Sequence, residues 1–434
     1  MNMKSINAKA AMMALAMVAT MGTTACSDDN DGPSQSQVEA QKVKEMSDIT
    51  EKYVNDVVYH TYDKLADASE KLYDEVGAMR SSLAAGTLTK TQIEQTCATF
   101  LEARAWWEKS EAWLYGPAEN WGIDPHIDTW PLSRPGLAKF LSNNKDEGGI
   151  FEPGFDINKA IEDVSKNNRE DSWLGFHGLE FILFRNGKTR TVADFQGEES
   201  ADEFAGSGVD GKLELDFAWA VAGDLRDHAY RLEVNWNEQA PQARRDRVQA
   251  RGWSLMDEPG YYTGYALTHP ASGMPYTSVR GAISTILNSG CMNIAQEVAD
   301  QKMGQVWRTA TGQGTAEDSQ DYIESPYSHK SFQDFYDNII SIKNALYGNI
   351  EKPNYDERSI MSYLHKYNPE LASNLQQGLD ASFDKLNVCM QGRAFVEVAY
   401  RGTAEELNNV ANAMEAINQL NEALNEADYW IQRN

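Results

Sequence analysis

Apolar residues recur at helical spacing along most of this 434-residue chain. Over 38–79 they are spaced mainly by three, four and seven residues, and no proline interrupts the segment. This spacing is typical of a long amphipathic helix that buries one side. A second stripe, in 403–430, comprises Leu407, Val410, Met414, Ile417, Leu420, Leu424 and Trp430. Alternating runs of β-branched residues are nearly absent, so the sequence predicts an all-α fold.

A polar stretch separates two groups of predicted helices. Residues 196–212, QGEESADEFAGSGVDGK, are rich in glycine and acidic side chains, which favours a boundary or an exposed excursion. We therefore expect an N-terminal helical half at 38–205 and a C-terminal helical half at 206–434, together forming a bundle of long helices in two halves. The predicted helices are 38–79, 92–115, 157–165, one beginning near 172, 213–236, 279–303, 329–347, 356–367, 371–400 and 403–430.

The N-terminus has the pattern of a lipoprotein export signal. Two lysines precede an apolar run, and small residues then lead to Cys26. We expect 1–25 to be a signal peptide, Cys26 to carry lipid, and 26–37 to be a flexible polar tether. The acidic start of this tether is similar to the signal that sends some lipoproteins to the outer face of the outer membrane. An ordinary acidic linker is the alternative. The expected location is thus outside the cell, with lipid as the membrane contact.

Charge and cysteine content limit the partners and the means of stabilisation. The chain has 39 basic and 65 acidic residues, a formal net charge of −26, and removal of 1–25 would leave −28. Such a charge disfavours nucleic acid and favours cations and solubility. Besides Cys26, only three widely spaced cysteines remain, Cys97, Cys291 and Cys389. An odd number at such spacing argues against a disulfide framework.

The segment GFHGLEF, residues 175–181, carries a candidate metal-binding pair. His177 and Glu180 stand three residues apart and share one helix face, where both can point at a single ion. Gly175 and Gly178 remove bulk beside the histidine, although each costs a helix about 0.8–1 kcal/mol relative to alanine. This cost suggests a packing or functional reason. The alternative is a buried histidine that donates one N–H to a carboxylate.

A second helix and the loop after it offer further ligands. One stripe of the predicted helix 92–115 contains Arg104, Glu108, Glu111 and Tyr115. The alternative is a solvated helix face with an Arg–Glu ion pair. The following loop, ENWGIDPHIDTWPL, adds Asp124, His126 and Asp128. Carboxylates with one imidazole suit iron, calcium or manganese at least as well as zinc.

Three segments resemble the imelysin-like family, also classed as M75 peptidases, whose hallmark is Gly-x-His-x-x-Glu. They are AWWEKSEAWLYGPAENWGIDPHIDTWPL, GFHGLEFILF and SPYSHKSFQDFYDNIISIKNALYG. The resemblance implies two related bundle-like helical halves with a site at their junction, in exported proteins linked to bacterial iron uptake. The family motif maps onto Gly175, His177 and Glu180. Related iron-transport members have Glu-x-x-Glu and Asp-Pro-x-x-Asp motifs, matched by Glu108, Glu111, Asp124 and Asp128.

The third of these segments predicts a helix with two polar stripes. One stripe contains Asp334, Asn338 and Ser341, and the other Asp337 and Asn344. Either stripe faces the junction or belongs to a solvated helix face.

These residues favour metal binding over catalysis. Zinc proteases commonly carry His-Glu-x-x-His, but no histidine here is followed by glutamate, and no Gly-x-Ser-x-Gly elbow is present. The leading hypothesis is a surface-anchored protein that binds iron as an ion or chelate, with zinc or haem as alternatives and an outer-membrane transport protein as a partner. An M75-type metallopeptidase and a structural or interaction lipoprotein are the competing hypotheses. We expect His177 and Glu180 to face Glu108 and Asp128 across one cavity, supported by Arg104, His126, Tyr115 and Asn338.

Overall fold

Helices account for nearly all regular structure in the residues that the computed structural model describes, 34–146, 148–166 and 172–434. The sheet of this part of the chain is one antiparallel hairpin of β1 (Phe184–Arg185) and β2 (Lys188–Thr189). The prediction of an all-α fold is therefore confirmed. The signal peptide and Cys26 lie outside the described residues, and helix α1 begins at Gln35, so the last three residues of the predicted tether are helical.

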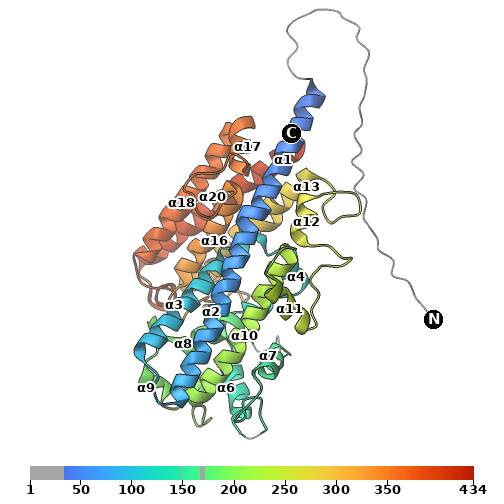
Figure 1. Cartoon of the computed structure of the whole chain (residues 1–434). Helices are drawn as coiled ribbons and strands as arrows, with labels where there is room; N and C mark the ends of the chain where they lie inside the picture. Colours follow the sequence, from blue (N-terminus) through green and yellow to red (C-terminus); the bar gives the residue numbers. More distant parts are fainter. Residues whose placement is uncertain (1–33, 147, 167–171) are drawn as a thin grey trace, which may run out of the picture. The chain divides into compact units, whose positions relative to one another are not determined.

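The helices in the N-terminal part of the chain pack against one another (Figure 1). Helix α2 packs on α3 and on α10, while α10 also packs on α7 and α8. Threonine caps α3, because Thr89 accepts from the backbone of Gln92 and the Gln92 side chain accepts in return. The elements up to residue 205 are α1 Gln35–Tyr53, the π-helical turn η1 Val54–Val58, α2 Tyr59–Ala84, α3 Lys90–Glu108, the 3₁₀ turn η2 Glu111–Trp113, α4 Pro117–Asn120, α5 Asp124–Ile127, α6 Arg134–Asn143, α7 Ile157–Lys166, α8 Gly175–Leu183, α9 Val192–Phe195 and the 3₁₀ turn η3 Asp202–Phe204.

A second set of helices packs around α16, α18 and α20. Gly378 permits the close approach of α18 to α20, since a Cβ there would lie 2.9 Å from Cα of Leu420. The elements after residue 205 are α10 Gly211–Trp236, α11 Gln242–Ala250, α12 Thr263–Thr268, α13 Val279–Ser284, the π-helical turn η4 Thr285–Met292, α14 Asn293–Gln296, the π-helical turn η5 Glu297–Lys302, α15 Gly304–Ala310, α16 Ser331–Tyr347, α17 Ile360–Tyr367, α18 Pro369–Met390, α19 Phe395–Arg401 and α20 Ala404–Arg433.

Two predicted helices end earlier than the apolar pattern indicates. Helix α3 stops at Glu108 instead of Tyr115, because Ser110 donates to the carbonyl of Trp107 through both its backbone N–H and its hydroxyl. The predicted helix 371–400 is two helices, α18 and α19, with a break that contains Gly392. In both places local hydrogen bonds or a glycine override a continuing apolar stripe.

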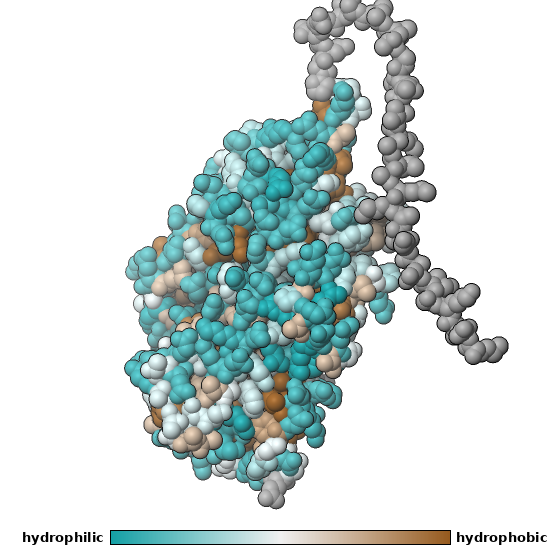
Figure 2. Space-filling view, viewed as in Figure 1, coloured by the Kyte–Doolittle hydropathy of each residue, from teal (hydrophilic) through white to brown (hydrophobic). Residues whose placement is uncertain are grey.

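Residues 42–434 form one unit, and nearly all of its buried apolar side chains belong to one continuous core. The predicted boundary between 205 and 206 stays a prediction. Among the described residues, no helix has the length and apolar character that crossing a membrane requires. Most of the surface drawn in Figure 2 is hydrophilic, as the acidic composition leads us to expect.

Candidate metal centre

Two glycines bring helix α8 into backbone contact with its neighbours. Gly175 has φ +62°, and a Cβ there would lie 2.0 Å from the carbonyl oxygen of Ile127. At Gly178 a Cβ would lie 2.4 Å from the carbonyl oxygen of Trp173. The glycines therefore serve packing, and the contact with Ile127 places Asp128 next to α8.

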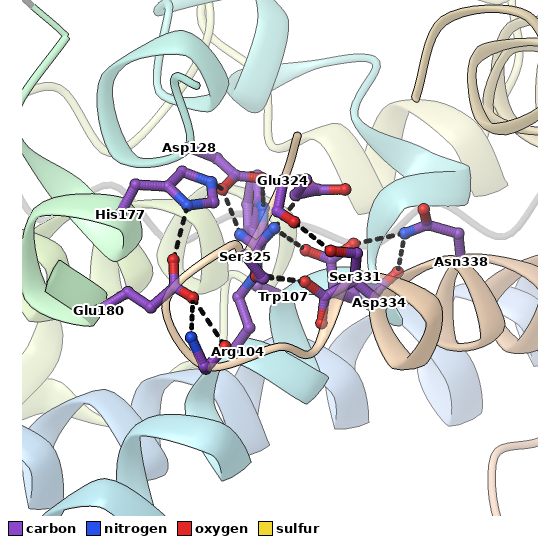
Figure 3. A network of polar contacts seen from close by, with 12 residues as sticks. Arg104, Trp107, Asp128, His177, Glu180, Glu324, Ser325, Ser331, Asp334 and Asn338 are labelled. Atoms are coloured by element: carbon purple, nitrogen blue, oxygen red, sulfur yellow. Dashed lines mark hydrogen bonds and ion pairs between the residues drawn. The ribbon is translucent and has the colours of Figure 1, made fainter. Parts of the chain in front are cut away.

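His177 lies between two carboxylates and is 1% exposed. Its Nδ1 is 3.4 Å from Oε2 of Glu180, and its Nε2 is 3.1 Å from Oδ1 of Asp128 (Figure 3). Burial alone would lower the pKa of His177, but the hydrogen bonds to Asp128 and Glu180 raise it to about 9. Without a bound cation, the imidazole is therefore protonated at neutral pH.

Backbone N–H groups of the 324–328 segment hold Glu180 in place. Its Oε1 accepts from the N–H of Tyr327 at 3.0 Å and from both the N–H and the hydroxyl of Ser328 at 2.7 Å. Ser325 in this segment has φ +50°, a conformation that side chains rarely adopt. Three donors thus satisfy one oxygen of Glu180, while the other oxygen faces His177.

Arg104 is the central cation of the site. Its guanidinium contacts Glu108 and Asp128, lies 2.6 Å from Oε1 of Glu324, and has Nε 3.6 Å from Oδ2 of Asp334. Burial would raise the pKa of Asp128, yet Arg104 and His177 hold it well below its usual value. Asp128 also accepts from Nε1 of Trp107 at 2.6 Å. The structure thus places Arg104, a predicted supporting residue, among the carboxylates of the cluster.

Lys302 is a second buried cation, which the sequence analysis did not identify. Its Nζ lies 3.2 Å from Oε1 of Glu324, 3.4 Å from Oε2 of Glu111 and 3.8 Å from Oε2 of Glu108. Although η2 carries Glu111 past the end of α3, the turn still points its carboxylate at this lysine. Lys302 and Arg104 together fill the space between the carboxylates. Where we expected a cavity, His177 and Glu108 are linked by polar contacts through Asp128 and Arg104.

Acidic groups outnumber basic groups in this cluster. Its carboxyl groups belong to Glu108, Glu111, Asp128, Glu180, Glu324 and Asp334, and its basic groups to Arg104, His177 and Lys302. Burial raises the pKa of Glu108 and of Glu111 well above the usual value, and raises that of Asp334 to about 7. These raised pKa values favour protons on part of the carboxyl groups at neutral pH, and a metal ion bound there would take the place of such protons.

The remaining predicted residues divide between this cluster and other places. Asn338 donates to Oε2 of Glu108 at 2.6 Å, so the structure brings it into the cluster. Asp124 lies at the margin, where burial, Asp128 and Glu297 raise its pKa to about 7. Tyr115 instead pairs with the hydroxyl of Tyr53 at 2.8 Å, because the chain leaves the helix after Glu108. His126 turns away from the cluster towards Asp224, 2.6 Å from its Nε2. The predicted supporting roles of Tyr115 and His126 at this cluster are wrong.

The polar stripe of Asp334, Asn338 and Ser341 on α16 is buried, so it is not a solvated helix face. Asp337 and Asn344 are also buried, at 2% and 5% exposure. Glu324 was missed, although it directly precedes the SPYSHK segment and shares the buried turn with Ser325. Lys302 had no sequence signal, since lysines in helical segments are usually solvated.

Two groups of donors in the cluster could hold a metal ion. Asp128, His177 and Glu324 offer ligand atoms within 4.8 Å of one another, as do Glu108, Glu111 and Asp128. Within the described part of the chain, Oε2 of Glu324 is buried without a hydrogen-bond partner, while Nε2 of His177 faces Oδ1 of Asp128 at 3.1 Å. Several carboxylates with one imidazole match the ligand preferences of iron or manganese, so these residues fit such an ion.

The architecture and this cluster define an all-helical protein with a buried histidine–carboxylate centre. The chain belongs to the imelysin family, peptidase class M75, because the family model matches residues 58–427. It is 24% identical over 312 residues to iron-regulated protein A of Synechococcus elongatus, covering 68% of this chain and 67% of that protein.

Solved structures share the fold. A crystal structure from Parabacteroides distasonis, titled as an iron-regulated protein A precursor, has a TM-score of 0.68 at 24% identity and covers 89% of this chain and 95% of its own. An imelysin-like protein from Psychrobacter arcticum has a TM-score of 0.51 at 12% identity, covering 88% and 93%.

Proposed function

We propose that this protein binds iron at the buried cluster and takes part in iron uptake. The observation that carries the proposal is the group of buried donors Asp128, His177 and Glu324, whose ligand atoms lie within 4.8 Å of one another. Burial raises the pKa of Glu108, Glu111 and Asp334, and a bound cation would stabilise their charged forms in place of a proton. Two similar proteins are named iron-regulated, which supports the choice of metal.

In this proposal Asp128, His177 and Glu324 are the ligands, and Glu180 orients the histidine. A carboxylate that accepts Nδ1–H fixes the ring and directs Nε2 at the ion, an arrangement common around metal-bound histidines. Arg104 contacts both Asp128 and Glu324, so it must give up these two partners when an ion enters. Its contacts with Glu108 and Asp334 offer it an alternative position. Glu108, Glu111 and Asp124 would then balance the remaining charge.

Anchoring by lipid on Cys26, on the outer face of the outer membrane, completes the proposal. The lipobox pattern and the acidic residues after it support this location. A protein held there would hand its iron to an outer-membrane transport protein. Labelling cells with a radioactive fatty acid tests the anchor: the wild type should incorporate label, whereas Cys26→Ala should not.

A structural role is the second candidate, because Arg104 and Lys302 already neutralise several carboxylates. In that case the cluster is a buried ion-pair network that fixes the helices, and no ion is needed. Proteolysis receives no comparable support. The cluster side chains are at most 3% exposed, which leaves a peptide no approach, and three donors occupy one oxygen of Glu180.

Calorimetric titration separates these candidates. Fe(II), Fe(III), Zn(II) and haemin are titrated into the purified protein, into His177→Gln and into His365→Gln, whose histidine is exposed on α17. We expect one equivalent of iron to bind the wild type and His365→Gln alike, with affinity at least tenfold weaker in His177→Gln. Absence of binding to the wild type, or equal binding to both histidine variants, would establish the structural role instead.

A further inference from the structure

A second group of ligating side chains lies outside the cluster. His126 of α5 and Asp224 and His228 of α10 offer ligand atoms within 4.8 Å of one another. Nε2 of His126 is 2.6 Å from Oδ2 of Asp224, and the two imidazole rings have centroids 4.4 Å apart. Asp224 and His228 are one helical turn apart, so one face of α10 presents both.

The environment of His228 fixes which of its nitrogens can bind an ion. Its Nδ1 lies 2.9 Å from the carbonyl oxygen of Asp224, which can only accept, so Nδ1 carries the proton. The lone pair of the neutral ring is then on Nε2. A backbone carbonyl that holds the other nitrogen is the usual support of a metal-bound histidine.

Asp224 adds an independent observation. It is 1% exposed, and its Oδ1 has no hydrogen-bond partner among the described residues. The basic side chains within 4 Å of Oδ1 are the neutral ring of His228, whose Nδ1 is 3.4 Å away, and Arg251, 3.7 Å away. Arg251 is engaged by Asp227 at 2.6 Å, so Asp224 keeps a carboxylate oxygen available.

We infer that His126, Asp224 and His228 form a second cation site, selective for Zn(II) or a related transition-metal ion. Two imidazoles and one carboxylate suit zinc, copper and nickel, whereas the carboxylate-rich cluster suits harder ions. Bonds of about 2.0–2.2 Å require ligand atoms roughly 3.3 Å apart, so His126 must move by less than about 1 Å from its present contact. His126 lies on a single-turn helix and its side chain is 12% exposed, which permits this movement and gives an ion a path of entry.

Zinc stoichiometry in a His177→Gln background tests this site separately from the iron proposal. Zn(II) is titrated calorimetrically into His177→Gln, and into the same protein carrying His126→Gln, His228→Gln or the control His365→Gln. We expect one zinc equivalent to remain in His177→Gln and in the His365 control. His126→Gln and His228→Gln should each weaken that equivalent at least tenfold.

Circular dichroism verifies that each variant is folded. Should the buried His228→Gln fail to fold, the partly exposed His126→Gln still decides the matter. The inference is overturned if His177→Gln takes up no zinc, or if the His126 variant binds it as tightly as the control. Neither result depends on whether the wild type binds iron.

Discussion

Lys302 shows how a single residue sets the balance of the buried cluster. It is 1% exposed and has carboxylates of Glu108, Glu111 and Glu324 around its ammonium group. Burial alone would lower its pKa, yet these carboxylates raise it well above the usual value, so the group is charged. Its role is that of a built-in counter-ion.

Replacing this counter-ion should destabilise the protein. Lys302→Met preserves the chain length but leaves three buried carboxylates with less compensation, so we expect the free energy of unfolding without metal to fall by about 3–5 kcal/mol. Urea unfolding followed by circular dichroism measures the change. Lys71→Met, at a half-exposed lysine, should change it by less than about 1 kcal/mol. Equal stability of the two variants would contradict the counter-ion role.

The family glycine Gly175 should tolerate no side chain. In Gly175→Ala the new Cβ meets the carbonyl of Ile127, and we expect a loss of more than about 3 kcal/mol in unfolding free energy. Gly86→Ala is the matched control, since Gly86 has φ +69° but nothing within 4 Å of the added Cβ. It should cost about 1–2 kcal/mol from backbone strain alone. If both variants lose the same stability, close packing is not the reason for Gly175.

At the scale of elements, apolar periodicity predicted where helices exist better than where they end. The stripe of 403–430 became α20, Ala404–Arg433. The end of α3 could not be predicted from the stripe, because Ser110 turns the chain by bonding to Trp107. Likewise, His126 and Asp128 are equivalent in the sequence pattern, but only the turn of α5 determines which one faces His177.

The β1–β2 hairpin is fixed to the following loop by a carboxylate that should make stability pH-dependent. Glu199 lies 2.6 Å from Arg185 and 3.2 Å from Arg190. Burial would raise its pKa, but a hydrogen bond from Glu214 and both arginines lower it to about 2. Because the folded pKa is below the ordinary value, Glu199 stabilises the protein above pH ~4.5 and loses this contribution as the pH falls to about 2.

Glu199→Gln should therefore reduce the free energy of unfolding by roughly 1–2 kcal/mol at pH 7, after allowance for solvent screening. Its difference from the wild type should shrink as the pH is lowered through that window. Urea unfolding at pH 7 and pH 3 measures both values. The exposed neighbour Glu198 provides the control, Glu198→Gln, which should match the wild type. A difference that grows at low pH would contradict the assignment.

For the whole molecule, the question is whether the two predicted halves unfold separately. Cys97 belongs to the first half and Cys291 and Cys389 to the second, and all three are buried and free. One continuous core joins residues on both sides of the predicted boundary. Helix α10, which starts the second half, packs on α2, α7 and α8 of the first.

Thiol labelling measures this directly. Burial raises the pKa of all three thiols to about 12, so the folded protein should not react with a thiol reagent. In Cys26→Ser we expect Cys97, Cys291 and Cys389 to become reactive over the same range of urea concentration, as identified by mass spectrometry. Earlier labelling of Cys97 alone, or of the other two, would indicate separate unfolding of the halves.

The single turn of α5 connects the buried cluster to the second proposed ion site. Asp128 directly follows this turn and contacts His177, while His126 on the turn contacts Asp224 of α10. Only Ile127 lies between His126 and Asp128, so we expect a displacement of one to be passed to the other. Thermodynamic linkage requires that both effects have the same size. If an ion at Asp128 changes the affinity for an ion at His126 by some factor, an ion at His126 changes the affinity at Asp128 by the same factor. In the two-site proposal, this coupling would let the supply of one ion regulate retention of the other.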